Sequence, residues 1–506
     1  MGRLKVLFLY PNLMMSMLVP NAISVLSAVL KREGHVTDLF DATLYKTDEA
    51  SNDERKVKTL QIRPFNLAER GVTIKETDMQ ADFLAKVQAF QPDLIAVSVV
   101  EDTYPIAVRL LDAVAHLNIP TVMGGVFATY APREVMAETT VQYLCRGEGE
   151  GALVDLCRAL STGADPSRIP NLWVRDAKGG IVQNEMRAAL DVNELPVQDL
   201  SVFEPQTLYR PMAGKVWRMA PIESQRGCPY KCTFCNSPSN VDVYKEADAG
   251  RFYRKRSWKH VYDEIVTLRD RHQIEYIFFI TDTFLAMSNA EFDEFIEMYS
   301  SIKLPFFMNT RPETLSSYRA RKLKEVHCHR VNIGVEHGNQ RFRREVVGRP
   351  VSDDQMINAF RYMNEAGIPV VANNILGFPD ETREMIFETI ELNRKFECDT
   401  INAFTFSPYH GTQLREMALQ RGYIRPEDRA TIYTKDTILN MPQLGKYEIR
   451  GLMKTFSLYV KLPKEYWPRI QMAERDDEEG LKAFEEMCEV FKPYAMKRVV
   501  DEPEDC

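Results

Sequence analysis

The feature that most constrains the fold of this chain is an alternation of strand and helix signals that runs through most of its 506 residues. Short apolar runs of strand length alternate with segments of helical spacing, which is typical of parallel sheets covered by helices. Over residues 1–195 this pattern predicts an α/β, doubly wound, Rossmann-like domain. A charged segment, 46–78, interrupts the pattern and is expected to be an insertion or long loop. The expected strands are 5–10, 36–40, 93–100, 120–124 and 143–145, and the expected helices are 21–32, 105–117 and 151–160.

A second alternating series follows a proline-spaced stretch, 196–222, that we expect to be a linker. Over 223–425 the series predicts a full or partial TIM-like βα barrel, whose active site would lie at the carboxyl ends of the strands. Residues 426–506 carry helical and charged patterns and are expected to form a mainly helical C-terminal extension, with helices at 447–460 and 478–491. The expected barrel strands are 276–281, 306–310, 330–336, 370–376 and 400–406, separated by helices at 258–271, 289–300, 316–326, 352–366 and 382–396.

Composition excludes several classes of protein. No apolar stretch reaches the roughly eighteen residues of a membrane span. The net charge of −8 argues against a broad phosphate-backbone interface, so no nucleic-acid partner is expected. Nine cysteines are too sparse for a disulfide scaffold, and Pro11 ends the first apolar run too early for a signal peptide. We therefore expect a cytoplasmic protein.

Three of the cysteines are crowded into eight residues, as Cys228, Cys232 and Cys235. Soft thiolates at this C-x3-C-x2-C spacing can hold one face of an iron–sulfur cluster. Three ligands on a four-iron cluster leave one iron open to a small molecule. Structural zinc is an alternative, but it usually takes four protein ligands and C-x2-C pairs. Buried free cysteines are the other alternative, although Pro229 and Lys231 indicate a loop.

Several further positions are ambiguous by themselves. The glycines of 124–125 and 147–149 follow strands at the carboxyl edge of the expected sheet, where they would form either tight turns or a ligand loop. Neither segment matches G-x-G-x-x-G, which disfavours a nicotinamide cofactor. Alternation would place His327 and His329 on one face of a strand and Cys328 on the other, which favours structure over metal binding. His410 is expected to face the barrel mouth and contact substrate.

The cysteine motif, with the aromatic Phe234 before its third cysteine and a βα series after it, resembles the signature of the radical S-adenosylmethionine (SAM) superfamily. Later segments resemble that family's strand-end motifs in the same chain order. These are Thr-Asp-Thr-Phe at 281–284, Asn-Thr-Arg-Pro-Glu at 309–313, Gly-Val-Glu-His-Gly at 334–338, Asn-Ile-Leu-Gly-Phe-Pro-Asp-Glu-Thr at 374–382 and Ser-Pro-Tyr-His-Gly-Thr at 407–412.

The N-terminal domain resembles the cobalamin (B12)-binding domain that precedes the barrel in the B12-dependent branch of that superfamily. Residues 20–23, 124–126 and 147–150 stand where that branch carries P-x-G-L, G-G-x-H and G-E-G-E. Phe127 stands at the histidine of G-G-x-H, and no D-x-H-x-x-G motif occurs. The resemblance, which covers about residues 4 to 420, therefore implies a bound cobalamin whose lower face lacks a histidine ligand.

The resemblance implies three cofactors and a set of residues for each. Cys228, Cys232 and Cys235 would hold a [4Fe-4S] cluster, and Glu336 would hold the amino group of SAM. The other candidates for contacts with SAM or its surroundings are Phe234, Asp282, Asn309, Arg311 and Gly377, with Gly377 letting the backbone approach the adenine. The candidates for contacts with cobalamin are Glu101, Asp102, Thr103, Gly124, Gly125, Val126, Phe127, Gly147 and Glu148.

The activity that the resemblance implies is that of a cobalamin-dependent radical SAM C-methyltransferase. One SAM would methylate cobalamin, and a second would give the 5′-deoxyadenosyl radical that abstracts hydrogen from an unactivated sp3 carbon, which then takes the methyl group of methylcobalamin. The substrate would be a small molecule or a peptide or protein residue, with the latter slightly favoured. An external electron donor such as flavodoxin or ferredoxin is expected.

Two other functions fit the same cofactors. One is a cobalamin-dependent radical SAM oxidative cyclase or ring-rearranging enzyme, whose product would lose hydrogens rather than gain a methylene unit. The other is a non-catalytic cobalamin-binding sensor, which the intact cysteine triad disfavours. Methylthio transfer is disfavoured because the N-terminal half has only Cys145 and Cys157 and lacks the additional cluster cysteines of that family.

Overall fold

The computed structural model describes residues 2–16 and 19–494. Its contacts divide the chain into two units that do not follow the order of the sequence. Within the described residues, the first unit takes in residues up to 52, then 65–227 and 239–275. The second takes in 53–64, 228–238 and the residues from 276 onward. The segment that carries the three cysteines therefore groups with the second unit, while both of its flanks group with the first.

The first unit is built on a sheet with the strand order β2-β1-β3-β4-β5-β6-β7. Its first five strands are parallel and follow the doubly wound order 2-1-3-4-5, which confirms the predicted Rossmann-like fold. Two antiparallel strands, which the sequence did not predict, extend one edge. The strands are β1 (Lys5–Tyr10), β2 (Val36–Asp41), β3 (Leu94–Ser98), β4 (Thr121–Gly124), β5 (Tyr143–Cys145), β6 (Leu172–Arg175) and β7 (Ile181–Gln183).

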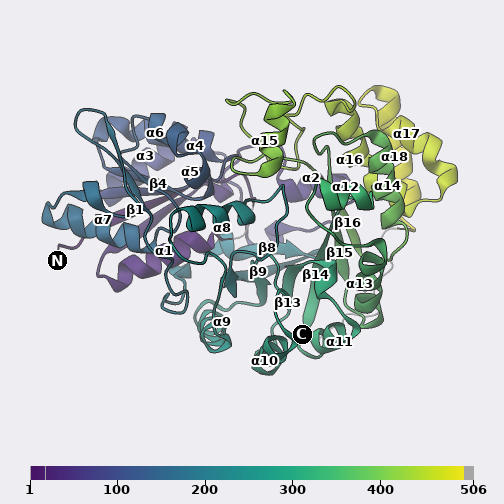
Figure 1. Cartoon of the computed structure of the whole chain (residues 1–506), viewed down its shortest axis with the longest axis horizontal. Helices are drawn as coiled ribbons and strands as arrows, with labels where there is room; N and C mark the ends of the chain where they lie inside the picture. Colours follow the sequence, from purple (N-terminus) through teal and green to yellow (C-terminus); the bar gives the residue numbers. More distant parts are fainter. Residues whose placement is uncertain (1, 17–18, 495–506) are drawn as a thin grey trace. The chain divides into compact units, whose positions relative to one another are not determined.

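The helices of the first unit pack in two groups (Figure 1). Helix α1 (Asn21–Arg32) packs with α7 (Glu150–Thr162), while α3 (Met79–Phe90) packs with α4 (Tyr104–Val114). Helix α3 was not predicted, because only two of its side chains, Phe83 and Val87, are buried. Two short helices, α5 (Val126–Tyr130) and α6 (Pro132–Ala137), follow β4.

The stretch 196–222, which was expected to be a linker, is not irregular throughout. Much of it forms a hairpin of β8 (Tyr209–Met212) and β9 (Lys215–Ile222). Ala213 and Gly214 make its two-residue turn, and both have positive φ, as tight hairpin turns require. A short antiparallel ribbon follows, formed by β10 (Gln225–Arg226) and β11 (Arg254–Lys255). Helix α8 (Asn236–Glu246) lies between these two strands in sequence, and α9 (Trp258–His272) follows the second.

The second unit contains five consecutive parallel strands, each separated from the next by one or more helices, which confirms the predicted partial βα barrel (Figure 1). Its strands are β12 (Tyr276–Phe279), β13 (Phe306–Thr310), β14 (Cys328–Glu336), β15 (Val370–Leu376) and β16 (Thr400–Thr405). The main intervening helices are α10 (Asn289–Tyr299), α11 (Ser317–Glu325), α13 (Asp353–Glu365) and α14 (Arg383–Asn393). A shorter helix, α12 (Gln340–Glu345), precedes α13 between β14 and β15, and α15 (Gln413–Gln420) follows β16.

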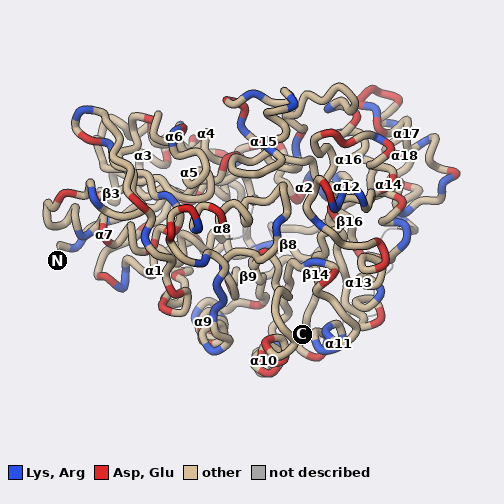
Figure 2. The backbone as a smooth tube through the Cα atoms, in the orientation of Figure 1, with Lys and Arg blue, Asp and Glu red and all other residues tan. Residues whose placement is uncertain are grey.

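The C-terminal part is helical, as predicted, with α16 (Lys446–Lys461), α17 (Trp467–Ala473) and α18 (Glu478–Phe491). Helix α16 packs against β16 and α14. Part of the interrupting segment, including most of α2 (Asn52–Lys58), joins this unit: the Ala403 N–H of β16 donates to Gln61 Oε1 at 3.0 Å. Charged residues of both signs occur mainly in helices and loops (Figure 2). None of the helices described is both long and apolar enough to cross a membrane.

Candidate functional site

The three cysteines lie in the loop after β10 and before α8. Cys228 is buried and its Sγ lies 3.4 Å from Thr283 Oγ1, while Cys235 Sγ accepts the Ser237 N–H at 3.4 Å. Between them, Thr233 fastens the loop, because its hydroxyl donates to the Val346 carbonyl at 2.6 Å. Burial raises the pKa of the Cys228 and Cys235 thiols, that of Cys235 to about 12. Metal binding would therefore have to displace these protons.

Arg311, at the end of β13, is directed at the cysteine loop. Its Nη1 donates to Cys232 Sγ at 2.9 Å, and its guanidinium lies over the Tyr230 ring at 4.0 Å. A 2.6 Å ion pair with Glu313 holds the opposite side of the guanidinium. The sequence predicted that Arg311 contacts the polar parts of SAM. In the structure its observed contact is with a cysteine sulfur, where an N–H donor tunes the electron density of a metal ligand.

Glu336 ends β14 in a left-handed backbone conformation and pairs with Arg349. Burial raises the pKa of the Glu336 carboxyl, and the charges of Arg349 and Arg311 partly offset this effect. Arg349 is 3% exposed, yet its Nε and Nη2 have no hydrogen-bond partner in the described part of the chain. These two donors form one side of the guanidinium fork, which matches a carboxylate. The neighbouring Gly348 lies against the cysteine loop, since a Cβ there would be 2.7 Å from the Lys231 carbonyl.

A buried histidine–glutamate pair fixes the turn after β15. The Gly377 and Phe378 N–H groups donate to Glu381 Oε2 at 2.5 and 2.9 Å, and Glu381 Oε1 lies 3.0 Å from His337 Nε2. His337 Nδ1 accepts the Asn339 N–H, so the proton of a neutral ring is on Nε2 and faces the carboxylate. A Cβ on Gly377 would meet Ile449 of α16 at 2.9 Å. The expected approach of this glycine to adenine stays a prediction.

The other predicted positions in the barrel lie at or near the strands. The charge of Asp282 acts on Cys228 and Cys235, which places its carboxylate near the cysteine loop. Asn309 of β13 accepts a hydrogen bond from Asn332 of β14 at 2.9 Å. The ring of Phe234 packs edge-on against Phe378, with centroids 6.0 Å apart. Asp282 thus lies near the cysteine loop, Asn309 links two strands, and Phe234 of the loop packs on the turn after β15.

Three histidines that the sequence singled out can be placed in the structure. His327 has a φ of +63° and precedes β14, so the expected alternation with His329 on one strand face is wrong. His329 Nδ1 lies 2.8 Å from the Tyr276 hydroxyl, which supports its structural interpretation. The carbonyl of His410 accepts a hydrogen bond from Asn236 at 2.7 Å. Its predicted substrate contact is untested.

In the first unit, most of the residues predicted to contact cobalamin lie at the ends of β3 and β4 or just after them, and two follow β5. Burial, followed by the charge of Glu101, raises the pKa of the Asp102 carboxyl to about 6. Thr103 is buried and its hydroxyl donates to the Val100 carbonyl at 3.2 Å. These residues follow β3, whose neighbour β1 marks the reversal of strand order, and this is where doubly wound sheets bind ligands.

The end of β4 and the residues after it, 124–127, are four of the positions predicted to contact cobalamin. A Cβ on Gly125, whose φ is +105°, would lie 2.4 Å from the Val99 carbonyl, so this glycine is required by backbone packing. Gly124 has no such strain. Val126 is 44% exposed and remains available to a ligand. Phe127 is buried in the domain core against Tyr104, with ring centroids 4.8 Å apart, and its predicted contact with cobalamin stays a prediction.

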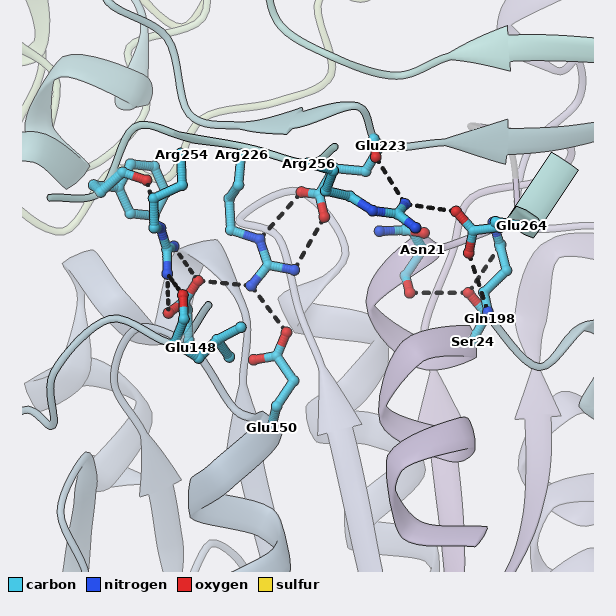
Figure 3. Close-up of polar contacts among 12 residues, drawn as sticks. Asn21, Ser24, Glu148, Glu150, Gln198, Glu223, Arg226, Arg254, Arg256 and Glu264 are labelled. Atoms are coloured by element: carbon cyan, nitrogen blue, oxygen red, sulfur yellow. Dashed lines mark hydrogen bonds and ion pairs between the residues drawn. The ribbon is translucent and has the colours of Figure 1, made fainter. Parts of the chain in front are cut away.

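Glu148, in the loop after β5, is surrounded by arginines (Figure 3). Its Oε1 accepts from Arg226 Nη1 at 2.6 Å, and its Oε2 accepts from Arg254 Nη1 at 3.1 Å. Burial alone would raise the pKa of the Glu148 carboxyl, but hydrogen bonds and charges from Arg254 and Arg226 lower it below its usual range. Gly147 has a φ of +79°, and a Cβ there would lie 2.7 Å from Met186 Cε. Glu148 is therefore engaged with protein side chains, and its predicted contact with cobalamin stays a prediction.

Two family models match the chain, each over one of these sites. Residues 222–392 match the Radical SAM superfamily, and residues 16–157 match the B12 binding domain. The chain is a B12-binding member of the radical SAM superfamily. The first match covers the cysteine loop with β12–β15, and the second covers β2–β5 with Asp102 and Val126.

Known proteins of this superfamily resemble the chain over most of its length. An uncharacterized methyltransferase of Pyrococcus horikoshii is 27% identical over 75% of this chain and 82% of its own. An anaerobic magnesium-protoporphyrin IX monomethyl ester cyclase of Rubrivivax gelatinosus is 25% identical over 64% of this chain but 58% of its own. The solved structure of the cobalamin-dependent SAM radical enzyme OxsB has a TM-score of 0.66 at 14% identity, covering 97% of this chain and 72% of OxsB. That of the radical SAM methyltransferase TsrM from Kitasatospora setae, with cobalamin and a [4Fe-4S] cluster, has a TM-score of 0.62 at 18% identity, covering 84% of this chain and 79% of TsrM.

Membership implies a [4Fe-4S] cluster, SAM and cobalamin, and the residues of this radical SAM protein fit the first two. Three cysteines and the donor from Arg311 to Cys232 suit a cluster held by thiolates. In the described residues, no trio of His, Cys, Asp or Glu side chains converges as it would around a single ion. The orphaned donors of Arg349 suit the carboxylate of SAM, and the adjacent Glu336 suits its amino group. For cobalamin, the structure shows after β4 the side chain of Val126, which is 44% exposed.

Sequence reasoning missed the two residues of this radical SAM barrel with the most distinctive surroundings. Arg349 lies 13 positions after Glu336, beyond any helical or strand period, and only the fold brings the two together. Its signal in the sequence is the Gly348-Arg349-Pro350 triplet after α12. Glu381 lies in the segment 374–382, which resembles a strand-end motif, but its partner His337 lies 44 positions earlier and only the fold brings the two together.

Proposed function

We propose that this chain is a cobalamin-dependent radical SAM C-methyltransferase that places a methyl group on an unactivated sp3 carbon. The observation that carries the proposal is the presence, in one chain, of a B12-binding domain and of an intact cysteine triad near Arg349, which has two buried donors without a partner in the described residues. The name of the Pyrococcus relative, which matches over 82% of its own length, supports methyl transfer. When bound, the cluster would supply the electron that cleaves SAM, and cobalamin would carry the methyl group.

The chain's own residues have distinct tasks in this proposal. Cys228, Cys232 and Cys235 hold the cluster, and Arg311 donates to Cys232. Arg349 holds the carboxylate of SAM and Glu336 holds its amino group. Both groups are largely buried, which strengthens their electrostatic interactions relative to those in water. The substrate is a small molecule or a peptide or protein residue, and an external reductant such as flavodoxin or ferredoxin supplies electrons in the cytoplasm.

A second candidate is an oxidative cyclase or ring-rearranging enzyme with the same cofactors. The matches to magnesium-protoporphyrin cyclases favour it, but they cover 58% and 53% of those proteins. A non-catalytic cobalamin sensor is the third candidate, and the cysteine triad argues against it.

Analysis of the nucleosides released from SAM separates these candidates. The protein would be reconstituted anaerobically with iron and sulfide, with and without hydroxocobalamin, reduced, and supplied with SAM. Methyl transfer predicts both 5′-deoxyadenosine and S-adenosylhomocysteine, with the latter formed only when cobalamin is present. 5′-Deoxyadenosine alone would favour the cyclase, and neither product from cluster-loaded protein would favour the sensor. Cys228→Ala should abolish 5′-deoxyadenosine formation while retaining bound cobalamin.

A further inference from the structure

The cysteine loop begins directly after β10, and Arg226 of this short strand lies in an unusual arrangement of charges. Arg226, two residues before Cys228, lies opposite Arg254 in the antiparallel β10–β11 ribbon. Side chains at opposite positions of such a pair are close neighbours, and like charges there repel. Both arginine side chains are about 85% buried, so water screens this repulsion poorly.

Three carboxylates neutralise this pair of arginines (Figure 3). Glu148 lies between the two guanidinium groups and accepts from both, through the contacts given above. Glu150, at the start of α7, accepts from Arg226 Nη1 at 2.9 Å. Glu223 accepts from the other side of Arg226 at 3.0 and 3.2 Å. Every arm of Arg226 therefore ends on a carboxylate, and two of the three acceptors come from the loop after β5 and the start of α7.

The backbone that presents Glu148 is itself fixed. The Glu148 N–H donates to the hydroxyl of the buried Tyr244 at 3.1 Å, and the Gly147 N–H donates to Thr129 Oγ1 at 3.1 Å. Asn171 Nδ2 donates to the Arg146 carbonyl at 2.7 Å. The loop thus has its own anchors and holds its carboxylates at defined positions toward the ribbon.

The residue between Arg226 and the first cysteine is also held. Gly227 has a φ of +86°, and a Cβ at this position would lie 2.8 Å from Cδ1 of Phe252. The chain therefore reaches Cys228 from a backbone pressed against the residues that precede β11. Arg226 and Gly227 together determine where the cysteine loop starts.

We propose that Glu148, Glu150 and Arg226 are positioning residues, which fix the entry of the cysteine loop and so determine how firmly the iron–sulfur cluster is held. Glu148 and Glu150, in a segment that resembles a cobalamin-domain motif, then serve the cluster loop rather than the corrin. The inference rests on the cluster and does not depend on methyl transfer.

The test compares Glu148→Gln, Arg226→Gln and Arg226→Lys with a matched control, Glu264→Gln. Glu264 forms a buried ion pair with Arg256, just after the same ribbon, at 2.6 Å, and is not among the partners of Arg226 and Glu148 described above. Iron and sulfide per chain would be measured after anaerobic reconstitution of the full chain. Iron release from the reduced protein to a ferrous chelator would then be followed, and hydroxocobalamin affinity would be measured by absorbance.

We expect Glu148→Gln and Arg226→Gln to release iron at least fivefold faster than the wild type, with Arg226→Lys between them and the wild type. The Glu264→Gln control should stay within twofold, and all variants should bind hydroxocobalamin within twofold of the wild type. Wild-type iron release from both Gln variants would overturn the proposal, as would loss of cobalamin by Glu148→Gln with the cluster retained. If Arg226→Gln does not fold, Glu150→Gln removes one acceptor of Arg226 and should give a smaller increase. An inactive wild type with a retained cluster would count against the proposed function alone.

Discussion

Replacement of Glu381 by alanine should destabilise the second unit strongly. Its carboxylate is fully buried: Oε2 accepts the Gly377 and Phe378 N–H groups, and Oε1 lies 3.0 Å from His337 Nε2. The alanine variant leaves the two N–H groups without their acceptor and removes the carboxylate that faces His337 Nε2. An unsatisfied buried donor costs about 1–3 kcal/mol, and breaking a buried pair costs about 3–5 kcal/mol in total. We expect a loss of about 3–5 kcal/mol, toward the lower end where water enters the vacated space.

Glu381→Gln should be milder but still measurable. The glutamine amide presents one acceptor and one donor, whereas all three groups that face this position donate. His337 cannot relieve the conflict by changing tautomer without losing the hydrogen bond from Asn339. One donor then opposes another in a buried site, which costs about 1–3 kcal/mol.

Thermal unfolding of the full chain would measure both effects. For units of roughly this size, 1 kcal/mol shifts Tm by about 2–4 °C, so Glu381→Ala should lower the Tm of the second unit by at least about 6 °C. Glu388→Gln is the control, because Glu388 lies on α14, the helix that follows Glu381, accepts from Asn339 at an exposed site and should change stability by under about 0.5 kcal/mol. A Tm of Glu381→Ala within 1 °C of the wild type would refute the reasoning.

Three further predictions concern single positions. Burial raises the pKa of the Asp102 carboxyl from 3.8 to about 6, so the protonated carboxyl stabilises the fold below the lower value, and this stabilisation is lost as pH rises through the higher one. Asp102→Asn should remove up to about 3 kcal/mol of this pH dependence, measured by urea unfolding between pH 3.5 and 7.5. An unchanged dependence of the unfolding free energy on pH would contradict the burial of Asp102. Gly125→Ala should cost at least about 2 kcal/mol in thermal unfolding, because its Cβ would strike Val99, whereas Gly163→Ala, with positive φ but open space, should cost less; equal losses would exclude the clash. Arg349→Ala should weaken SAM binding to the cluster-loaded protein at least tenfold in calorimetry, with Arg349→Lys intermediate, and unchanged affinity would remove Arg349 from the SAM site.

Local patterns in the sequence predicted much of the fold. The bounds of helices 21–32 and 478–491 coincide with α1 and α18, and the strands of the barrel were found within two residues. These elements are periodic over enough residues to show which face is buried. The cysteine spacing was equally informative, because a cluster loop gathers its ligands within a few residues.

The features that the sequence did not reveal depend on contacts between distant residues. Helix α3 buries too few side chains to show a period, and the hairpin β8–β9 was hidden by prolines that are tolerated there. Glu148 and Arg226 are 78 positions apart, and nothing local distinguishes a carboxylate that binds an arginine from one that awaits a ligand. The burial of Phe127 likewise follows from its packing on Tyr104 and not from its motif.

The most direct test of the central claim is electron paramagnetic resonance of the reduced, reconstituted protein as SAM is added. The central claim is that three cysteines carry a four-iron cluster with one open iron, beside Arg349 and Glu336. It predicts the signal of a reduced four-iron cluster whose line shape changes on addition of SAM, and loss of that signal in Cys235→Ala. A fully loaded cluster whose spectrum is indifferent to saturating SAM would contradict the account.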